Sequence, residues 1–132
     1  MPKCLFCNLY EKHEELLVDT EYFYAVFDTA PVSKGHALII PKQHIVSFFD
    51  LDENQVIELF EAIRMVKEQL EEEFHPDGYN IGVNEGLSGG RSINHLHVHL
   101  IPRYAGDSLV KGGVRNVLGK FVAEDEAWRK HI

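Results

Sequence analysis

Residues 95–101, His95-Leu96-His97-Val98-His99-Leu100-Ile101, alternate between histidine and apolar side chains up to Leu100. Successive side chains of a strand point to opposite faces, so the alternation predicts a β-strand with three histidines on one face. Three adjacent imidazoles are rarely a packing choice, because each polar ring needs a hydrogen-bonding partner. The segment therefore indicates a functional site. Its spacing alone does not separate metal ligands from a nucleophile.

A glycine-rich loop precedes this strand. Residues 84–94 contain Gly86, Gly89 and Gly90, followed by Arg91. Glycine lets backbone N–H groups approach a ligand closely, and consecutive amides can form an anion-binding nest. Beside histidines this composition suits a phosphate, although a plain flexible turn explains the loop alone equally well.

The rest of the chain is typical of one α+β domain. Strands are predicted at residues 15–18, 22–27, 35–40, 79–83 and 95–101, with a short helical turn at residues 4–10. We expect one domain over residues 1–132, with a core at about 4–107 and a C-terminal tail at 108–132. In the tail, Lys111 and Arg115 could touch phosphate or a partner subunit, or lie on a plain surface.

One long helix is predicted between the third and fourth of these strands. Asp50 or Asp52 can cap it, and Glu53 suits a capping box with Asp50. Residues 75–78, which include Pro76 and Gly78, end it. Helical spacing predicts one buried apolar face. Its residues are Val56, Leu59, Phe60, Ile63, Val66 and Leu70.

Composition and charge limit the partners. The chain has 132 residues and a formal net charge of −8, which argues against broad binding to nucleic acid or to anionic membranes. No apolar run approaches the roughly 18 residues of a membrane span, and the N-terminus lacks the apolar stretch of a secretory signal. We expect a cytoplasmic protein without a membrane or nucleic-acid partner.

Two cysteines, Cys4 and Cys7, are spaced Cys-x-x-Cys. In the cytosol such a pair suggests metal or redox chemistry rather than a structural disulfide. With His44 and His95 they could complete a tetrahedral Cys2His2 set, which is the geometry of a closed structural zinc site. A redox pair and two unpaired thiols are the alternatives.

Several segments together resemble the histidine-triad (HIT) nucleotide-binding superfamily. They are residues 35–42, His44, Asn84-Glu85-Gly86 and residues 95–103, in the expected order. The residues after Arg103 are similar to the Fhit-like and dinucleoside-polyphosphate hydrolase branches, whereas residues 83–86 look Hint-like. The resemblance covers roughly residues 4–107. It implies a HIT-like fold, in which a five-stranded antiparallel sheet carries one long helix and a short N-terminal helix, and it implies a homodimer.

The resemblance also implies a mechanism. His97 matches the middle histidine, which attacks the α-phosphorus and forms a nucleotidyl-histidine intermediate. A neutral imidazole is a sensible nucleophile at pH 7, and a backbone carbonyl is expected to fix its tautomer. His99 matches the third histidine, which is catalytic and contacts phosphate. Further phosphate contacts are expected from His36, Asn84, Arg91 and Ser92.

Arg91 departs from the pattern, because related proteins commonly have glutamine four residues before the triad. A permanent cation could bind a polyphosphate chain, or could equally point to solvent. By matching positions, Asp28 is expected to bind the ribose hydroxyls of a nucleoside, a purine by preference, whose base lies on apolar residues. Those residues are Leu5, Phe6, Leu9, Val26, Phe27 and Leu38.

The resulting hypothesis is a nucleotide hydrolase that cleaves a dinucleoside polyphosphate or a related adenylylated compound. Phosphorolysis and hydrolysis of nucleoside phosphoramidates are the enzymatic alternatives, and a nucleotide-binding sensor is the non-enzymatic one. The resemblance extends to zinc as a structural ion bound by Cys4, Cys7, His44 and His95. A divalent cation could accompany the polyphosphate.

Overall fold

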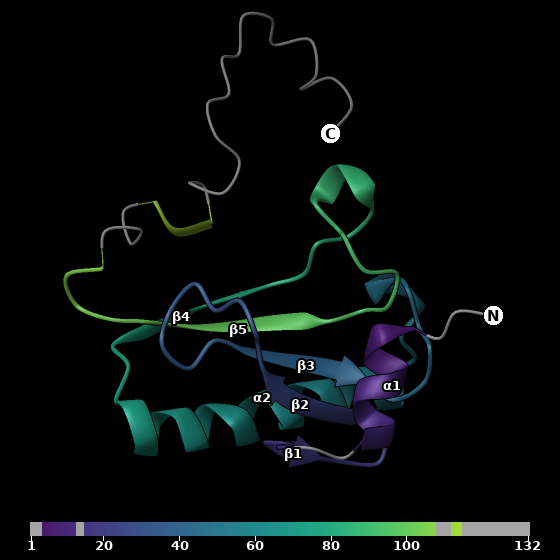
Figure 1. Ribbon diagram of the computed structural model, residues 1–132, viewed down its shortest axis with the longest axis horizontal. Helices are drawn as coiled ribbons and strands as arrows, with labels where there is room; N and C mark the ends of the chain where they lie inside the picture. Colours follow the sequence, from purple (N-terminus) through teal and green to yellow (C-terminus); the bar gives the residue numbers. More distant parts are fainter. Residues whose placement is uncertain (1–3, 13–14, 108–111, 115–132) are drawn as a thin grey trace, which may run out of the picture.

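The computed structural model describes residues 4–12, 15–107 and 112–114, and these build a single antiparallel sheet with a helix on each face. The strand order is β1-β2-β3-β5-β4 (Figure 1). The strands are β1 Val18–Asp19, β2 Phe23–Phe27, β3 Ala37–Pro41, β4 Gly78–Gly82 and β5 Val98–Arg103. The expected α+β class is confirmed.

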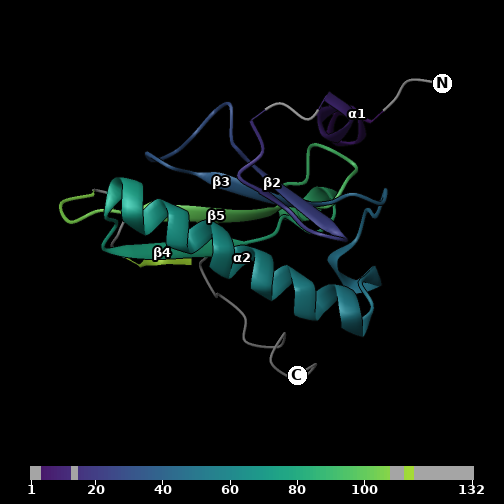
Figure 2. The same ribbon diagram turned by 90° about the horizontal axis from the view of Figure 1, so that it is seen from below.

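The long helix α2, Glu53–Phe74, packs on one face of the sheet. The short helix α1, Leu5–Lys12, lies on the other side, as Figure 2 shows. Alternation along the strands supplies both cores. On the α2 side the buried residues are Val18, Phe23, Ala25, Ala37, Ile39, Leu59, Ala62, Val66, Leu70, Val98 and Leu100, and on the α1 side they are Phe6, Tyr24, Val26, Leu38 and Ile40.

The start and the buried face of α2 differ from the prediction. The capping box joins Asp52 with Gln55 rather than Asp50 with Glu53, because Asp50 belongs to a preceding 3-10 helix, Phe48–Asp50. The predicted core residues Val56 and Phe60 are 47% and 61% exposed. The helix is rotated so that Leu59, Ala62, Val66 and Leu70 meet the sheet.

The strand boundaries also shift. β5 begins at Val98, so His95 and His97 precede the ladder instead of lying within it. Pro41 is the last residue of β3 and pairs with Phe23, whereas Pro102 is the last but one residue of β5 and pairs with Tyr79. Each proline sits beyond the β3–β5 pairing, so its strand has a neighbour on one side only. A missing N–H is tolerated at such a place.

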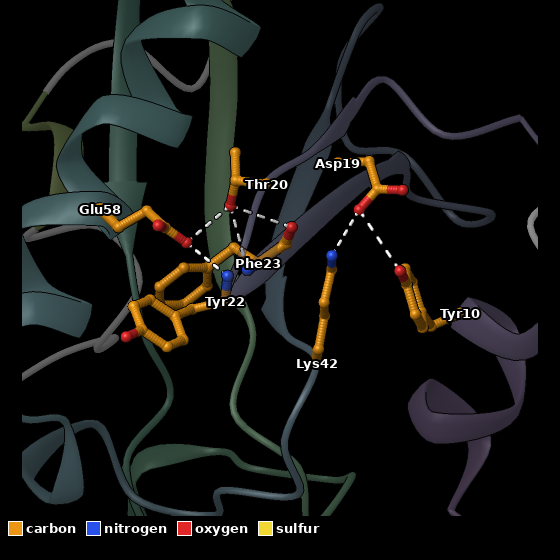
Figure 3. Close-up of polar contacts among 7 residues, drawn as sticks. All are labelled: Tyr10, Asp19, Thr20, Tyr22, Phe23, Lys42 and Glu58. Carbon is orange, nitrogen blue, oxygen red and sulfur yellow. Dashed lines mark hydrogen bonds and ion pairs between the residues drawn. The ribbon is translucent and has the colours of Figure 1, made fainter.

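A polar contact ties α2 to the turn between β1 and β2. The Glu58 carboxylate accepts a hydrogen bond from the Thr20 hydroxyl at 2.8 Å and one from the Tyr22 backbone N–H at 2.5 Å (Figure 3). The strand predicted at residues 15–18 overlaps β1 only at Val18. Among the described residues, no helix is long and apolar enough to cross a membrane. Except for residues 112–114, the C-terminal tail lies outside the described residues.

Candidate active site and metal centre

His97 is held by a backbone carbonyl. Its Nδ1 lies 2.9 Å from the carbonyl oxygen of His95. A carbonyl only accepts hydrogen bonds, so Nδ1 carries the proton and Nε2 presents a lone pair. The expected carbonyl is therefore present, and the half-buried ring has the tautomer that a nucleophile needs.

His99 is oriented by a chain of two hydrogen bonds. The backbone N–H of Val32 donates to Nδ1 of His36 at 3.2 Å, which leaves the proton of a neutral His36 on Nε2. That Nε2 lies 2.9 Å from Nδ1 of His99 and donates to it. The remaining nitrogen of His99, Nε2, then carries a proton and can donate to a ligand.

Burial keeps these two imidazoles neutral. It lowers the pKa of His36 below its ordinary value, against the opposing charge of Asp28. Burial, followed by the neighbouring His97 and His36, lowers the pKa of His99 to about 4. At pH 7 both rings are therefore neutral rather than imidazolium ions. The direction of each hydrogen bond between them then depends on which ring nitrogen carries the proton.

Asp28 lies beside this chain, where β2 ends. Its Oδ2 is 3.5 Å from Nε2 of His36, its Oδ1 accepts the N–H of Ala30 at 2.9 Å, and its own N–H donates to the His36 carbonyl at 2.9 Å. The ligand atoms of Asp28, His36 and His99 lie within 4.8 Å of one another. A metal ion on Nε2 of His36 would require a proton on Nδ1, which would face the Val32 N–H. The geometry therefore favours hydrogen bonding over metal binding.

The glycine loop uses its backbone internally. The N–H groups of Gly89 and Arg91 donate to the Gly86 carbonyl, and that of Gly90 donates to the Leu87 carbonyl. The prediction of an anion nest is wrong for these three amides, because they are already paired within the loop. The positive φ angles of Gly86 (+76°) and Gly90 (+96°) permit this tight turn.

The polar side chains of the loop take different positions. Asn84 and Ser92 are exposed. Arg91 points inward rather than to solvent, because its side chain is only 17% exposed and its Nη1 lies 3.9 Å from the Glu85 carboxylate. Glu85 also accepts the N–H of Phe48 at 2.8 Å and so anchors the loop to the 3-10 helix.

The structure brings together most of the expected apolar residues of the nucleoside pocket. Phe6, Val26 and Leu38 are buried in one cluster on the α1 side of the sheet, with Leu9 packed against it. Phe27 lies on the opposite face, where its ring packs against Phe74 of α2 at a centroid distance of 6.2 Å. Phe27 is therefore not part of this surface, because an odd step along β2 reverses the direction of the side chain. Leu5 is 59% exposed.

A second cluster joins Cys4 and Cys7 to His44 and His95. Nδ1 of His95 lies 3.2 Å from the sulfur of Cys4 and 3.6 Å from that of Cys7, and Nδ1 of His44 lies 3.6 Å from the sulfur of Cys7. All four ligand atoms are within 4.8 Å of one another. The sequence-predicted ligand set thus converges from the α1 segment, the segment after β3 and the segment before β5.

These four residues fit a zinc ion. Bonds of about 2.3 Å to sulfur and about 2.0 Å to nitrogen hold the ligands of a tetrahedron roughly 3.3–3.8 Å apart, close to the three distances above. Nε2 of the fully buried His95 donates to the Pro41 carbonyl at 2.8 Å, so Nδ1 is the bare nitrogen that faces the thiols. Burial also lowers the pKa of His95, which favours the neutral ligand form.

Sequence reasoning missed the partners that set the tautomers of His36 and His95. The donor is the backbone N–H of Val32, and the acceptor is the carbonyl of Pro41. Neither leaves a signal in the sequence, since any residue except proline supplies an N–H and every residue supplies a carbonyl. Glu85 lay within the recognised motif, but its bond to Phe48 depends on a contact 37 residues away.

Comparisons with known proteins agree with this fold. The family model described as HIT domain matches residues 10–106. An uncharacterised HIT-like protein from Methanocaldococcus jannaschii is 36% identical over 118 residues, which cover 86% of this chain and 91% of that protein. An asymmetrical bis(5'-nucleosyl)-tetraphosphatase from Schizosaccharomyces pombe is 31% identical over 81% of this chain, which spans 59% of that relative's length.

A third relative is an adenosine 5'-monophosphoramidase from the same yeast, 30% identical over 76% of this chain and 74% of that protein. Among solved structures, a Zn-bound histidine triad family protein from Mycobacterium smegmatis superposes with a TM-score of 0.73 and 30% identity. The match covers 81% of this chain and 79% of that one.

Proposed function

Because the chain belongs to the HIT-domain family, we propose that it cleaves a nucleotide at its α-phosphate through a covalent intermediate on His97. One observation carries the proposal. The His95 carbonyl holds the proton on Nδ1 of His97 at 2.9 Å, which leaves Nε2 as the nucleophilic nitrogen.

The reaction proceeds in two displacements. Nε2 of His97 attacks the α-phosphorus, a P–N bond forms, and the bond from phosphorus to the leaving group breaks. The Nε2–H of His99 is directed by the chain from Val32 through His36 and donates to a phosphoryl or leaving oxygen. Water then attacks phosphorus, the P–N bond breaks, and the nucleoside monophosphate leaves.

The substrate class is a dinucleoside polyphosphate or a related adenylylated compound, in line with the tetraphosphatase relative. The buried cluster with Phe6, Val26 and Leu38 receives a purine base, with Leu9 and the exposed Leu5 at its margin. Phe27 is left out of this pocket. Asp28, which already contacts His36 at 3.5 Å, binds the ribose hydroxyls.

The exposed side chains of Asn84 and Ser92 bind the phosphates. Arg91 can also reach the polyphosphate once its ion pair with Glu85 is broken. A divalent cation accompanies the polyphosphate, because such anions are held as metal complexes. Zinc is the structural ion of Cys4, Cys7 and their two histidine partners. Thiols that bind a metal suit a reducing compartment, and we place the protein in the cytoplasm.

A homodimer is part of the proposal. β4 is an edge strand of the sheet, and edge strands are usually covered. Within β4, Ile81 is 54% exposed, and with the exposed Val56 and Phe60 of α2 it lines a groove of about 310 Å³. A second copy docked there would extend the sheet and bury these apolar side chains.

A nucleoside phosphoramidate is the second candidate substrate, because one relative is named a monophosphoramidase and the first step would be the same. Phosphorolysis differs only in the acceptor of the second step. Turnover of diadenosine tetraphosphate and of adenosine 5'-phosphoramidate, with and without inorganic phosphate, separates these activities.

The test of the mechanism is a covalent adduct. Rapid quenching of wild-type protein with diadenosine tetraphosphate in alkaline denaturant, in which a P–N bond on histidine survives, should trap one AMP on His97, detected by mass spectrometry. His97→Ala should lose the adduct and turnover, whereas His75→Ala, which alters the histidine at the far end of α2, should keep both. Full turnover by His97→Ala would refute the mechanism.

A further inference from the structure

Phe6 lies between the two clusters of the site. Its side chain is buried at 4% exposure. Its ring centroid is 5.0 Å from that of His97 and 5.8 Å from that of His95, and it meets the His95 ring edge-on at 87°. One aromatic ring thus contacts both the proposed nucleophile and a proposed zinc ligand.

His97 needs such a support, because it precedes the β5 ladder. The ring makes a hydrogen bond from Nδ1 to the His95 carbonyl. This bond holds Nδ1, but small changes in the χ1 and χ2 torsions can still move Nε2. The ring of His97 also packs against Phe6 and against His99, whose ring centroid is 5.1 Å away. These two contacts restrict the movement of the ring.

Phe6 in turn depends on what holds α1. A helix of eight residues is not stable by itself. Tyr10 anchors its C-terminal half, where it shares Asp19 with Lys42 (Figure 3). Cys4 and Cys7 anchor its start, on either side of Phe6 in the chain, through the contacts with His95 and His44. The metal-binding residues are thus the tie nearest to Phe6.

We propose that Phe6 is a positioning residue for His97, and that the set Cys4, Cys7, His44 and His95 holds it there. His95 contributes both to the metal-binding set and to the orientation of His97. Its side chain faces the thiols, and its carbonyl fixes the His97 tautomer. The proposed zinc site therefore controls the direction of the nucleophile as well as the stability of the N-terminal segment. This inference rests on the proposed function only in taking His97 as the nucleophile.

The test compares Phe6→Leu with Tyr10→Phe, which removes a hydroxyl from the same helix without touching His97. In single-turnover experiments with diadenosine tetraphosphate, Phe6→Leu should form the AMP adduct about 10- to 100-fold more slowly, since a misplacement of about 1 Å has effects of this order. Because Phe6 also lines the proposed base pocket, the two rates are compared at saturating substrate, where a loss of affinity does not contribute. Both variants should bind zinc like wild type, measured by elemental analysis. Tyr10→Phe should keep the wild-type rate.

A second readout does not depend on turnover. Long-range proton–nitrogen NMR spectra report which nitrogen of His97 carries the proton. We expect one Nδ1–H tautomer in zinc-loaded wild type and a mixture in Phe6→Leu and after removal of zinc by a chelator, which can enter through an open pocket of about 590 Å³ at Cys7 and His44. An unchanged rate and spectrum in Phe6→Leu would overturn the inference, as would a loss of affinity with a normal adduct rate. If wild type forms no adduct, the proposed function fails while the NMR comparison still decides the role of Phe6.

Discussion

Acidification should destabilise the fold through His99. The pKa of His99 is lowered to about 4 by burial and by its histidine neighbours, whereas an unfolded histidine titrates near 6.5. Between these two pH values the unfolded chain binds a proton that the folded chain excludes. The stability contributed by this effect is present above pH 6.5 and is lost as the pH falls toward 4.

The magnitude follows from the same pKa values. Each pKa unit corresponds to about 1.4 kcal/mol, so His99 alone accounts for up to about 3 kcal/mol of stability lost between about pH 6.5 and pH 4. His36 and His95 act in the same direction, because burial lowers their pKa values as well. A loss of this size is a large part of the free energy of unfolding of an ordinary domain.

The assay is urea unfolding at intervals from pH 8 to pH 4, followed by circular dichroism, for wild type and His99→Gln. Glutamine does not titrate, so the variant should lose up to about 3 kcal/mol less than wild type over this range. Carboxylates and metal ligands titrate in both proteins and cancel in the difference. Parallel stability curves for the two proteins would refute the assignment of a buried, neutral His99.

Three further outcomes test other parts of the structure. Asp52→Ala should lower the free energy of unfolding by about 1 kcal/mol by removing the α2 cap, whereas Asp50→Ala should leave it nearly unchanged; the reverse order in denaturant titrations would contradict the observed capping box. Glu58→Ala should cost about 1–3 kcal/mol, because the backbone N–H of Tyr22 loses its partner, and a thermal unfolding curve equal to that of wild type would show that this contact between α2 and the β1–β2 turn does not stabilise the fold. Cys7→Ser should lose most of the bound zinc and lower the melting temperature, as measured by elemental analysis and calorimetry, and a full zinc content would exclude Cys7 as a ligand.

The site depends on backbone groups as much as on its histidines. The carbonyls of His95 and Pro41 each hold one imidazole proton, and the N–H of Val32 excludes one. The three histidines of the motif therefore have three different surroundings. His95 faces thiols, His97 presents a bare Nε2, and His99 ends a hydrogen-bond chain.

Several features could be predicted from the sequence because they depend on local patterns. The alternation at residues 95–101 predicted apolar side chains on the face opposite the histidines, and Val98 and Leu100 do lie in the core beneath α2. The spacing of Cys4 and Cys7, with His44 and His95, identified four side chains that do converge. The existence of α2 and the α+β class followed from periodicity, which neighbouring residues determine by themselves.

Other features depended on contacts between segments far apart. The rotation of α2, which buries Ala62 and exposes Phe60, is set by the sheet surface rather than by helical spacing. Phe27 lies on the face of the sheet opposite to Val26 and Leu38, because side chains alternate along β2, and it packs there against Phe74. Three loop amides donate hydrogen bonds within the loop and are not free to bind an anion. The glycine content alone could not predict this pairing.

The motif on residues 95–99 by itself determined that histidines would gather at one place, because its spacing and apolar neighbours are local properties of the chain. The division of their roles was decided only by the tertiary structure. A tautomer is set by whichever donor or acceptor reaches the ring. For His95 and His99 the partners come from Cys4, Pro41 and His36, 54 to 91 residues away, and folding alone brings them into contact.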